Sequence, residues 1–302
     1  KNDFDLVNNV FQNHPYMQLK LSDFACIRSN WQDKAQNMRE IAEELNLDLS
    51  SFVYFDDNPA ERFLIAHELP EVLTVDVPDD CSEFTRCLLD LDVFETLHIT
   101  DEDKQRTKLY QNERERKRLK SKITDLNSYL NELNITVEIF VWDEFAIPRI
   151  AQLTQRTNQF NLTTRRYSES DINLLAHSES SLIYYIKSGD RFGEHGIVAT
   201  CIIHIKDDSW EIDTFLLSCR VIGRGIEQAF LHFICQNAIK KNIKKIIGKF
   251  LPTQKNTIAE SFYPNMGFKI QSSNKQENVF SLDLSSNLVS LPMHINKINR
   301  GL

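Results

Sequence analysis

The sequence predicts an α/β protein built from two domains joined by a helical connector. The chain has 302 residues, of which 41% are hydrophobic, so it has enough apolar material for two compact cores. Residues 1–98 alternate helical and strand patterns, and residues 135–285 do so again. The connector, residues 99–134, is charged and has no strand pattern, and residues 286–302 form a tail without a clear period.

The charge balance and the cysteines exclude several classes of function. With 35 Lys and Arg against 43 Asp and Glu, the net charge of −8 argues against general binding to nucleic acids or to anionic membranes. No apolar run approaches the roughly 20 residues that a membrane-spanning helix needs. The six cysteines contain no C-x-x-C pair, which favours free thiols in a reducing compartment. We therefore expect a cytoplasmic protein.

Within residues 1–98, the order of elements predicts βα units around a parallel sheet. Ala35, Met38 and Leu45 recur at helical spacing on one face. The run Ser51–Phe55 is typical of a strand, and Asn58-Pro59 opens the next helix with Asn as its cap and Pro at the first helical position.

Two carboxylates, Asp56 and Asp57, directly follow this strand. Ligands bind at the carboxyl ends of strands in open α/β sheets, and adjacent carboxylates there repel unless a hard cation such as Mg²⁺ neutralises them. Lys34, at the start of the preceding helix, is placed to compensate the charge of a phosphate. Capping and turn formation explain the same Asp-Asp-Asn-Pro pattern, so both interpretations stay open.

The connector contains a strongly basic run, Glu113–Lys122. A solvated helix explains this run, and a contact face for an acidic carrier protein is the alternative. RNA binding is disfavoured because no aromatic residues interleave with the charges.

Residues 135–285 begin with a strand and then alternate helices and strands. Ser168, with Asp171 three residues on, is typical of a capping box that starts a helix. The other expected elements are strands at Ile135–Trp142, Leu182–Lys187, Gly196–Lys206, Trp210–Ser218 and Lys244–Leu251, a helix beginning near Gly225, and a helix over Asn256–Met266 that Gly267 ends.

A glycine turn, Arg220-Val-Ile-Gly-Arg-Gly225, lies between a strand and an amphipathic helix. Glycines let the backbone approach a pyrophosphate, and the free N–H groups of the first helical turn bind anions. The candidate cofactor-binding residues here are Leu217, Arg220, Val221, Ile222, Gly223, Arg224 and Gly225. Cys219 just before the turn is either a reactive thiolate that relays an acyl group or a small buried apolar residue.

The hexapeptide and the segment Asn256–Phe268 resemble the R-x-x-G-x-G/A and N-x-x-A-x-x-[FL]-Y-x-x-x-G-F patterns of GCN5-related N-acetyltransferases (GNAT). The resemblance implies acetyl-CoA, CoA or phosphopantetheine at the turn, with Asn256 beside the pantetheine arm. It also implies Tyr263 as the general acid that protonates the departing thiolate. Packing of Tyr263 beside Phe262 and Phe268 is the alternative.

The polar loop Thr157–Tyr167 follows the first helix of this region. In the acetyltransferase fold the corresponding loop lines the acceptor cleft, which makes Asn158, Asn161 and Arg165 substrate-binding candidates. A loop that satisfies its own backbone is the alternative. We expect His195, on the Gly-flanked loop Arg191–Gly196, to be solvated.

Residues Val53–Arg62, preceded by Asn30–Ile41, resemble the third and fourth motifs of the FkbH-like branch of the haloacid dehalogenase (HAD) superfamily. The likeness extends over nearly the whole chain, through Leu69–Val72, Phe94–Leu97, the connector, Thr154–Tyr167 and Leu217–Gly225. It implies part of a HAD-type Rossmannoid domain over residues 1–98 and a GNAT-like acyltransferase domain over residues 135–285. It also implies Lys34 as the phosphate-binding lysine and Asp56 and Asp57 as Mg²⁺ ligands, Asp57 also being catalytic.

The family implies an enzyme that takes a phosphoglyceryl donor of the 1,3-bisphosphoglycerate class, removes phosphate and loads the acyl unit onto the phosphopantetheine thiol of an acyl carrier protein, in polyketide or related biosynthesis. Its aspartate nucleophile lies in a D-x-D-x-T-like strand end that this chain does not contain. Because Lys1-Asn2-Asp3 resembles the end of the second motif, we expect a member that lacks the N-terminal part of the first domain. An acyl-CoA-dependent N- or O-acyltransferase with a vestigial first domain and a carrier-docking module without activity are the alternatives.

Overall fold

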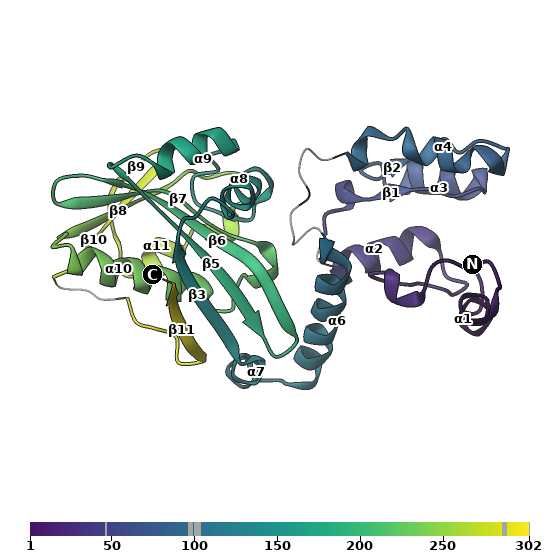
Figure 1. Ribbon diagram of the computed structural model, residues 1–302, viewed down its shortest axis with the longest axis horizontal. Coiled ribbons are helices and arrows are strands. Elements are labelled where there is room, and N and C mark those ends of the chain that lie inside the picture. Colours follow the sequence, from purple (N-terminus) through teal and green to yellow (C-terminus); the bar gives the residue numbers. More distant parts are fainter. Residues whose placement is uncertain (46, 96–98, 100–103, 286–288, 302) are drawn as a thin grey trace. The chain divides into compact units, whose positions relative to one another are not determined.

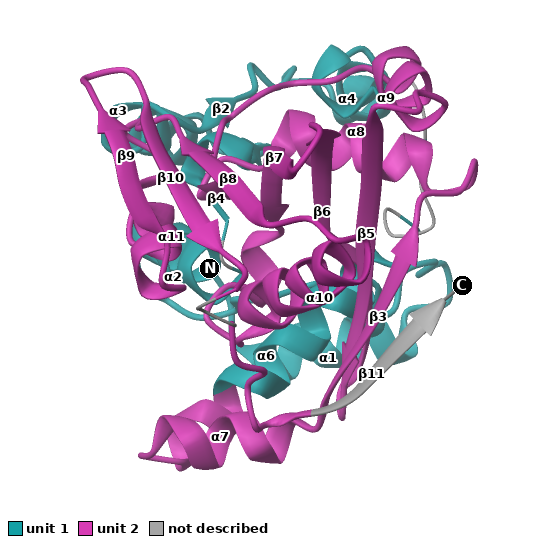
Figure 2. Ribbon diagram, turned by 90° about the vertical axis from the view of Figure 1, so that its left-hand side faces the viewer, with its two compact units in different colours: residues 1–117 teal, residues 118–302 magenta. Residues whose placement is uncertain are grey.

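The computed structural model describes residues 1–45, 47–95, 99, 104–285 and 289–301. It divides the chain into two compact units, unit 1 (Lys1–Lys117) and unit 2 (Arg118–Leu302), shown in separate colours in Figure 2. Helices and strands alternate in both units, so the predicted α/β fold class is confirmed.

Unit 1 is a small α/β assembly with a short parallel pair of strands (Figure 1). Its helices and strands are α1 (Phe4–Asn13), α2 (Lys34–Leu45), β1 (Val53–Tyr54), α3 (Pro59–Glu68), β2 (Leu73–Thr74), α4 (Phe84–Leu89) and the first part of α6 (Arg106–Lys122). β1 and β2 pair in parallel, as predicted. Their core is a cluster of five buried residues, Ala35, Met38, Ile65, Leu69 and Val72.

Local sequence explains where these helices begin. The Asn58 side chain accepts a hydrogen bond from the backbone N–H of Ala60, and Pro59 occupies the first turn of α3. The predicted face of α2 is the buried one, because Ala35, Met38 and Leu45 are all buried. The Phe94–Leu97 motif is described only in part: Phe94 is 57% exposed, and Thr96 and Leu97 lie outside the described residues.

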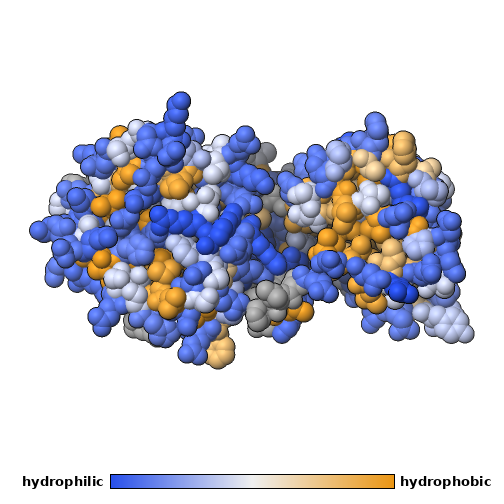
Figure 3. Space-filling view, turned by 90° about the horizontal axis from the view of Figure 1, so that it is seen from above, coloured by the Kyte–Doolittle hydropathy of each residue, from blue (hydrophilic) through white to orange (hydrophobic). Residues whose placement is uncertain are grey.

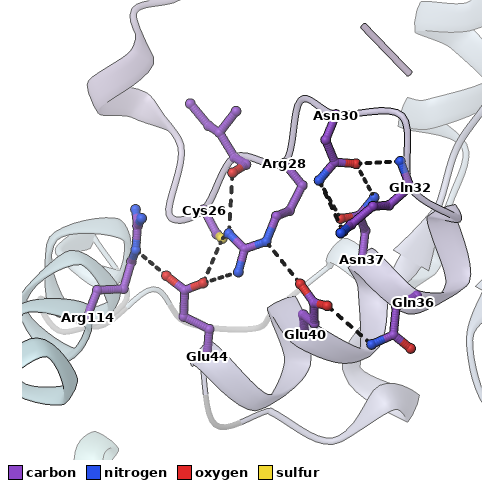
Figure 4. Close-up of polar contacts among 10 residues, drawn as sticks. Cys26, Arg28, Asn30, Gln32, Gln36, Asn37, Glu40, Glu44 and Arg114 are labelled. Carbon is purple, nitrogen blue, oxygen red and sulfur yellow. Dashed lines mark hydrogen bonds and ion pairs between the residues drawn. The ribbon is translucent and has the colours of Figure 1, made fainter. Parts of the chain in front are cut away.

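The basic run of α6 is partly an anchor within unit 1. Figure 4 shows that Arg28 and Arg114 bind the carboxylate of Glu44 from opposite sides. Lys117 donates to the Glu44 carbonyl at 2.7 Å, and Arg116 is only 1% exposed. These side chains are therefore not the solvated face that the charge pattern predicts, because long basic chains also reach carboxylates and helix-end carbonyls.

Apolar side chains also lie on the surface of unit 1, as the hydrophobic areas of Figure 3 show. Phe63 on α3 and Leu89 on α4 are each 75% exposed, and Leu88 is 42% exposed. The small core of unit 1 thus leaves a substantial share of its apolar residues in contact with solvent.

Unit 2 contains a nine-stranded sheet with helices on both faces. The strand order is β11-β3-β5-β6-β7-β8-β10-β9, and β4 pairs with β7 off this path. The strands are β3 (Ile135–Val141), β4 (Phe160–Asn161), β5 (Ser181–Asp190), β6 (Gly193–Ile205), β7 (Ser209–Leu217), β8 (Lys245–Phe250), β9 (Lys269–Ser273), β10 (Asn278–Asp283) and β11 (Ile295–Gly301). The helices are α7 (Leu126–Leu133), α8 (Ile147–Arg156), α9 (Glu169–Ala176), α10 (Ile226–Lys240) and α11 (Phe262–Asn265).

Two apolar clusters fix the helices on the sheet. One joins α8 and α9 to the sheet through Ile150, Ile172 and Ile183. The other joins α10 and α11 to the opposite face through Phe230, Phe262 and Phe215. The capping box that starts α9 is confirmed, because Ser168 and Asp171 bond each other's backbone N–H groups.

The sheet is irregular in the middle of β7. The β6–β7 register pairs Ile202 with Thr214 and Ile203 with Ile212, so Asp213 is left over as a bulge. The parallel pairing of β7 with β8 ends at Ile212 and Gly248. Beyond that point, Leu162 of the α8–α9 loop donates to the Phe215 carbonyl of β7 and accepts from the Leu251 N–H that follows β8. The loop therefore fills the widening between the two strands.

Two expectations about the C-terminal region need correction. The prediction of one continuous helix over Asn256–Met266 is wrong, because this stretch forms a 3-10 turn (Thr257–Ala259) and the short α11. Pro264 has no N–H and disfavours helical geometry in the residue before it, so it fits only the first turn of a helix. The tail, for which the sequence shows no period, contributes β11, which pairs in parallel with β3.

Candidate functional site

Lys34 and Asp56 meet at the carboxyl end of β1 in unit 1. The Lys34 Nζ lies 2.5 Å from the Asp56 Oδ2, which also accepts from the Tyr54 hydroxyl at 2.6 Å. The Asn58 N–H donates to the other carboxylate oxygen at 2.9 Å. Burial alone raises the pKa of Asp56, but the bonds from Lys34, Tyr54 and Asn58 outweigh burial and hold it below its usual value.

These residues do not form a magnesium site by themselves. Both oxygens of Asp56 already accept hydrogen bonds, whereas Asp57 is exposed. Among the described residues no group of three or more His, Cys, Asp or Glu side chains is placed to hold a metal ion. The arrangement presents a cationic lysine and a fixed carboxylate at a strand end, and Mg²⁺ would need further oxygen ligands there.

The glycine turn in unit 2 lies between β7 and α10, as the sequence predicts. Gly223 and Gly225 both have φ of +75°, and α10 follows directly with Gly225 as its N-cap. A Cβ atom on Gly223 would meet nothing within 4 Å, and no described group accepts a hydrogen bond from its N–H. One side of the turn is thus open beside the N-terminus of a 15-residue helix.

The chain itself covers the other side of the turn. A Cβ atom on Gly225 would lie 2.9 Å from the His294 Nε2 and 3.2 Å from the Pro292 Cγ. The His294 ring also bonds the Arg224 carbonyl at 2.9 Å. Any ligand of the turn must therefore approach on the Gly223 side.

The two arginines of the turn differ in their surroundings. Arg224 is 7% exposed, and its guanidinium contacts Asp190 at 3.4 Å and His195 at 3.3 Å. His195 is itself only 2% exposed, so the expectation that it is solvated is wrong. Arg220 is half-buried, and its Nε donates to the Ser218 Oγ at 3.3 Å. Arg224 holds the turn from within the protein.

The remaining residues of the turn divide between core and surface. Leu217 and Val221 are fully buried in the core, and Ile222 packs at its edge. Cys219 is exposed, so its alternative interpretation as a buried apolar residue is wrong.

Tyr263 and Asn256 lie inside unit 2. Tyr263 is 1% exposed, packs against Gly248 of β8, and has a hydroxyl with no hydrogen-bond partner among the described residues. Burial raises the pKa of Tyr263 far above its usual value, so the hydroxyl keeps its proton. Asn256 is fully buried and donates to the Asn161 and Leu251 carbonyls at 3.0 and 2.9 Å, which ties the α8–α9 loop to the end of β8.

The three predicted acceptor residues have different surroundings. Asn161 is fully buried and bonds the Thr157 carbonyl and the Thr164 N–H, and Asn158 accepts from Arg166. Asn158 is half-buried, whereas Arg165 is exposed and binds the buried carboxylate of Asp213. Asp213 is not among the residues predicted from the sequence, although a carboxylate within an apolar strand was a signal that could have found it.

The chain was compared with known proteins. No family model matches it, and no curated protein matches it. Among solved structures, the N-terminal part of protein BF1531 from Bacteroides fragilis, which contains a phosphatase domain complexed with Mg, is 38% identical over 32% of this chain and 26% of its own, with a TM-score of 0.31. This chain thus spans about a quarter of that structure's length.

Other similar structures are acetyltransferases. The ribosomal-protein-S18-alanine N-acetyltransferase from Escherichia coli is 14% identical over 49% of this chain and 94% of its own, with a TM-score of 0.40. PaiA N-acetyltransferase from Thermoplasma acidophilum, solved with coenzyme A, is 14% identical over 49% of this chain and 99% of its own, with a TM-score of 0.37. All three TM-scores are below 0.5, so the function proposed below rests on the residues of the chain itself. No described helix is long and apolar enough to cross a membrane.

Proposed function

We propose that unit 2 transfers acyl groups and binds the phosphate handle of a CoA or phosphopantetheine thioester at the glycine turn. The observation that carries this proposal is the open Gly223 side of the turn, where an unused N–H lies beside the N-terminus of α10. Backbone N–H groups and the positive end of a helix favour a phosphate at this position.

The residues present fit such a thioester. Tyr263 is the proposed proton donor to the departing thiolate, because its hydroxyl has no hydrogen-bond partner among the described residues. When bound, CoA or phosphopantetheine supplies the activated acyl group. The chain holds the phosphate at Gly223, and residues 160–163, which fill the space beyond the β7–β8 pairing, would border the pantetheine arm.

Calorimetric titration with CoA tests the phosphate cradle. We expect Gly223→Glu to abolish binding because it places a carboxylate on the open side of the turn. Gly267→Glu is the matched control, since Gly267 also has a positive φ, +82°, and open space around its Cβ position. Unchanged CoA affinity in Gly223→Glu, or equal loss in both variants, would refute the proposal.

We infer further that unit 1 handles the phosphorylated end of the acyl donor, as the FkbH-like resemblance implies. The Lys34–Asp56 pair at the end of β1 supports this inference, because a lysine placed at a strand end compensates phosphate charge. The substrate would then be a phosphoglyceryl donor, the acceptor the thiol of a holo acyl carrier protein, and Mg²⁺ the cation that Asp56 and Asp57 help to bind.

Intact-mass analysis of a holo carrier protein separates the candidate functions. The protein, expressed from its full coding sequence, is incubated with the carrier, Mg²⁺ and 1,3-bisphosphoglycerate. A glyceryl mass increase that Lys34→Ala removes supports loading. Acylation of small amines or alcohols from acetyl-CoA, without any change in the carrier, favours the N- or O-acyltransferase, and carrier binding without chemistry favours the docking module.

A further inference from the structure

Asp213 organises a polar cluster on the sheet face that also carries α8 and α9. As the bulged residue of β7, Asp213 has a carboxylate that is completely buried. The Tyr167 hydroxyl donates to its Oδ2 at 2.6 Å, and the Thr214 hydroxyl does so at 2.9 Å. Arg165 and His204 meet its Oδ1, the His204 Nε2 at 3.4 Å. A buried carboxylate with this many donors is a fixed anchor.

Two members of the cluster reach the surface. The side chain of Arg165 is 42% exposed, and that of His204 is 33% exposed. Arg165 uses only its Nη1 for Asp213, and its other N–H groups have no partner among the described residues. A guanidinium held on one edge and free on the other presents a planar pair of donors that matches a carboxylate or a phosphate.

The backbone before Arg165 is strained in a way that directs this side chain. Thr164 has φ of +53°, a left-handed conformation that β-branched residues rarely adopt. The Asn161 side chain accepts from its N–H, and the Thr163 hydroxyl donates to the Asp213 carbonyl at 2.8 Å, so the loop is held in place. Strain that the surrounding structure maintains is common at functional sites.

The surrounding charges favour an anion. Burial, with Arg165, Lys206 and Lys249 nearby, lowers the pKa of His204 and outweighs the opposing effect of Glu211. Lys249 pairs with Glu211 at 2.5 Å, so Arg165 and the exposed Lys206 are the cations near His204 that face solvent. Asp213 balances the charge of Arg165, so an anion here would be held by hydrogen bonds to the free edge of the guanidinium and by the positive charge of Lys206 nearby.

We propose that Arg165 and His204, held by Asp213, form a recognition site for the anionic group, a carboxylate or a phosphate, of a small substrate. Its role as the substrate site of acyl transfer rests on the function proposed above, whereas the anion binding does not. Asp213 acts as a positioning residue, Arg165 binds the ligand through the N–H groups that Asp213 does not use, and the His204 ring borders it.

Histidine-ring NMR tests this site directly, with acetate and inorganic phosphate as probes at constant ionic strength and His204→Gln to assign the signal. We expect one or both anions to shift the His204 resonance saturably and to raise its titration midpoint. Arg165→Ala should weaken binding at least tenfold, and Arg165→Lys, which keeps the charge but loses the planar fork, should also weaken it. Arg191→Ala, which removes an exposed arginine paired with Glu132, should leave it unchanged.

The outcomes separate this site from the glycine turn. Shifts no larger than those from sodium chloride, or equal affinity in folded Arg165→Ala, would overturn the proposal. A response to phosphate alone identifies a phosphate site, and a response to acetate alone identifies a carboxylate site. We expect Gly223→Glu to abolish CoA binding and Arg165→Ala to leave it unchanged. If the wild-type protein binds the anion but does not bind CoA, the acyl-transfer proposal is refuted and the anion site is not.

Discussion

Glu227, in the first turn of α10, has a buried carboxylate oxygen without a hydrogen-bond partner among the described residues. Burial raises its pKa, and the backbone N–H groups of Glu227 and Gly225 offset this only in part. The folded state therefore favours the protonated acid, and ionisation costs stability as pH rises through the raised pKa.

We expect Glu227→Gln to increase the free energy of unfolding at neutral pH by about 1 to 3 kcal/mol, because it removes a buried charge that is poorly compensated. The gain should shrink at about pH 4, where both the folded and the unfolded chain are protonated. Urea unfolding at both pH values measures it, with the exposed Glu260→Gln as control. A gain that does not depend on pH would contradict this explanation.

Lys34 and Asp56 give unit 1 the opposite pH dependence. The pKa of Asp56 is lowered in the folded state, so its contribution is present above the usual aspartate range and is lost as pH falls through the folded pKa. We expect Lys34→Met to destabilise the protein by about 1 to 3 kcal/mol near neutral pH and by less in acid.

The half-exposed pair of Arg39 and Glu68, 3.3 Å apart, provides the control for this prediction. Arg39→Met should cost less than about 1 kcal/mol, because solvent screens exposed pairs. Equal losses of unfolding free energy in the two variants, measured with urea, would show that the Lys34–Asp56 pair stabilises the protein no more than an exposed ion pair does.

At the scale of elements, β8 and α11 meet where Tyr263 crosses Gly248. A Cβ atom at Gly248 would lie 2.3 Å from the Tyr263 Cζ, so the strand needs a glycine here to let the ring pack against it. We expect Gly248→Ala to cost about 1 to 3 kcal/mol of stability through overpacking, measured by thermal or urea unfolding.

Gly189 in β5 is the matched control, because its Cβ would meet only the carboxylate end of Glu194, which can move. Gly189→Ala should therefore cost less. In a Tyr263→Leu background, Gly248→Ala should also cost less stability than in the wild-type protein. An unchanged loss of stability would show that overpacking against the Tyr263 ring is not its cause.

At the scale of the whole molecule, the two units differ in the size of their cores. Unit 1 has one cluster of five buried apolar residues, whereas the clusters of unit 2 extend over both faces of a nine-stranded sheet. We expect unfolding in two steps, with unit 1 first, because a small core leaves a small margin over chain entropy. Hydrogen exchange under mild denaturant should expose the amides of α2 and α3 before those of β5, β6 and β7, and a single cooperative exchange of both units would contradict this.

Sequence patterns predicted what depends on neighbouring residues. The capping box of α9 and the cap and proline of α3 follow from interactions within four residues, and the structure confirms them. The same local logic failed over Asn256–Met266, where Pro264 decided the backbone, and it gave no signal for β11, whose partner β3 is far away in the chain.

By itself, then, the sequence determined the fold class, most strands and helices of unit 2 and the place of the glycine turn. Only the tertiary structure decided which side of that turn is open, that Arg224 and His195 are buried together, and that Arg165 meets Asp213 from 48 residues away. The physical reason is that a cap or a turn satisfies its own backbone, whereas a charge pair across the sheet depends on strand register, bulge and loop packing, which no short stretch of sequence contains.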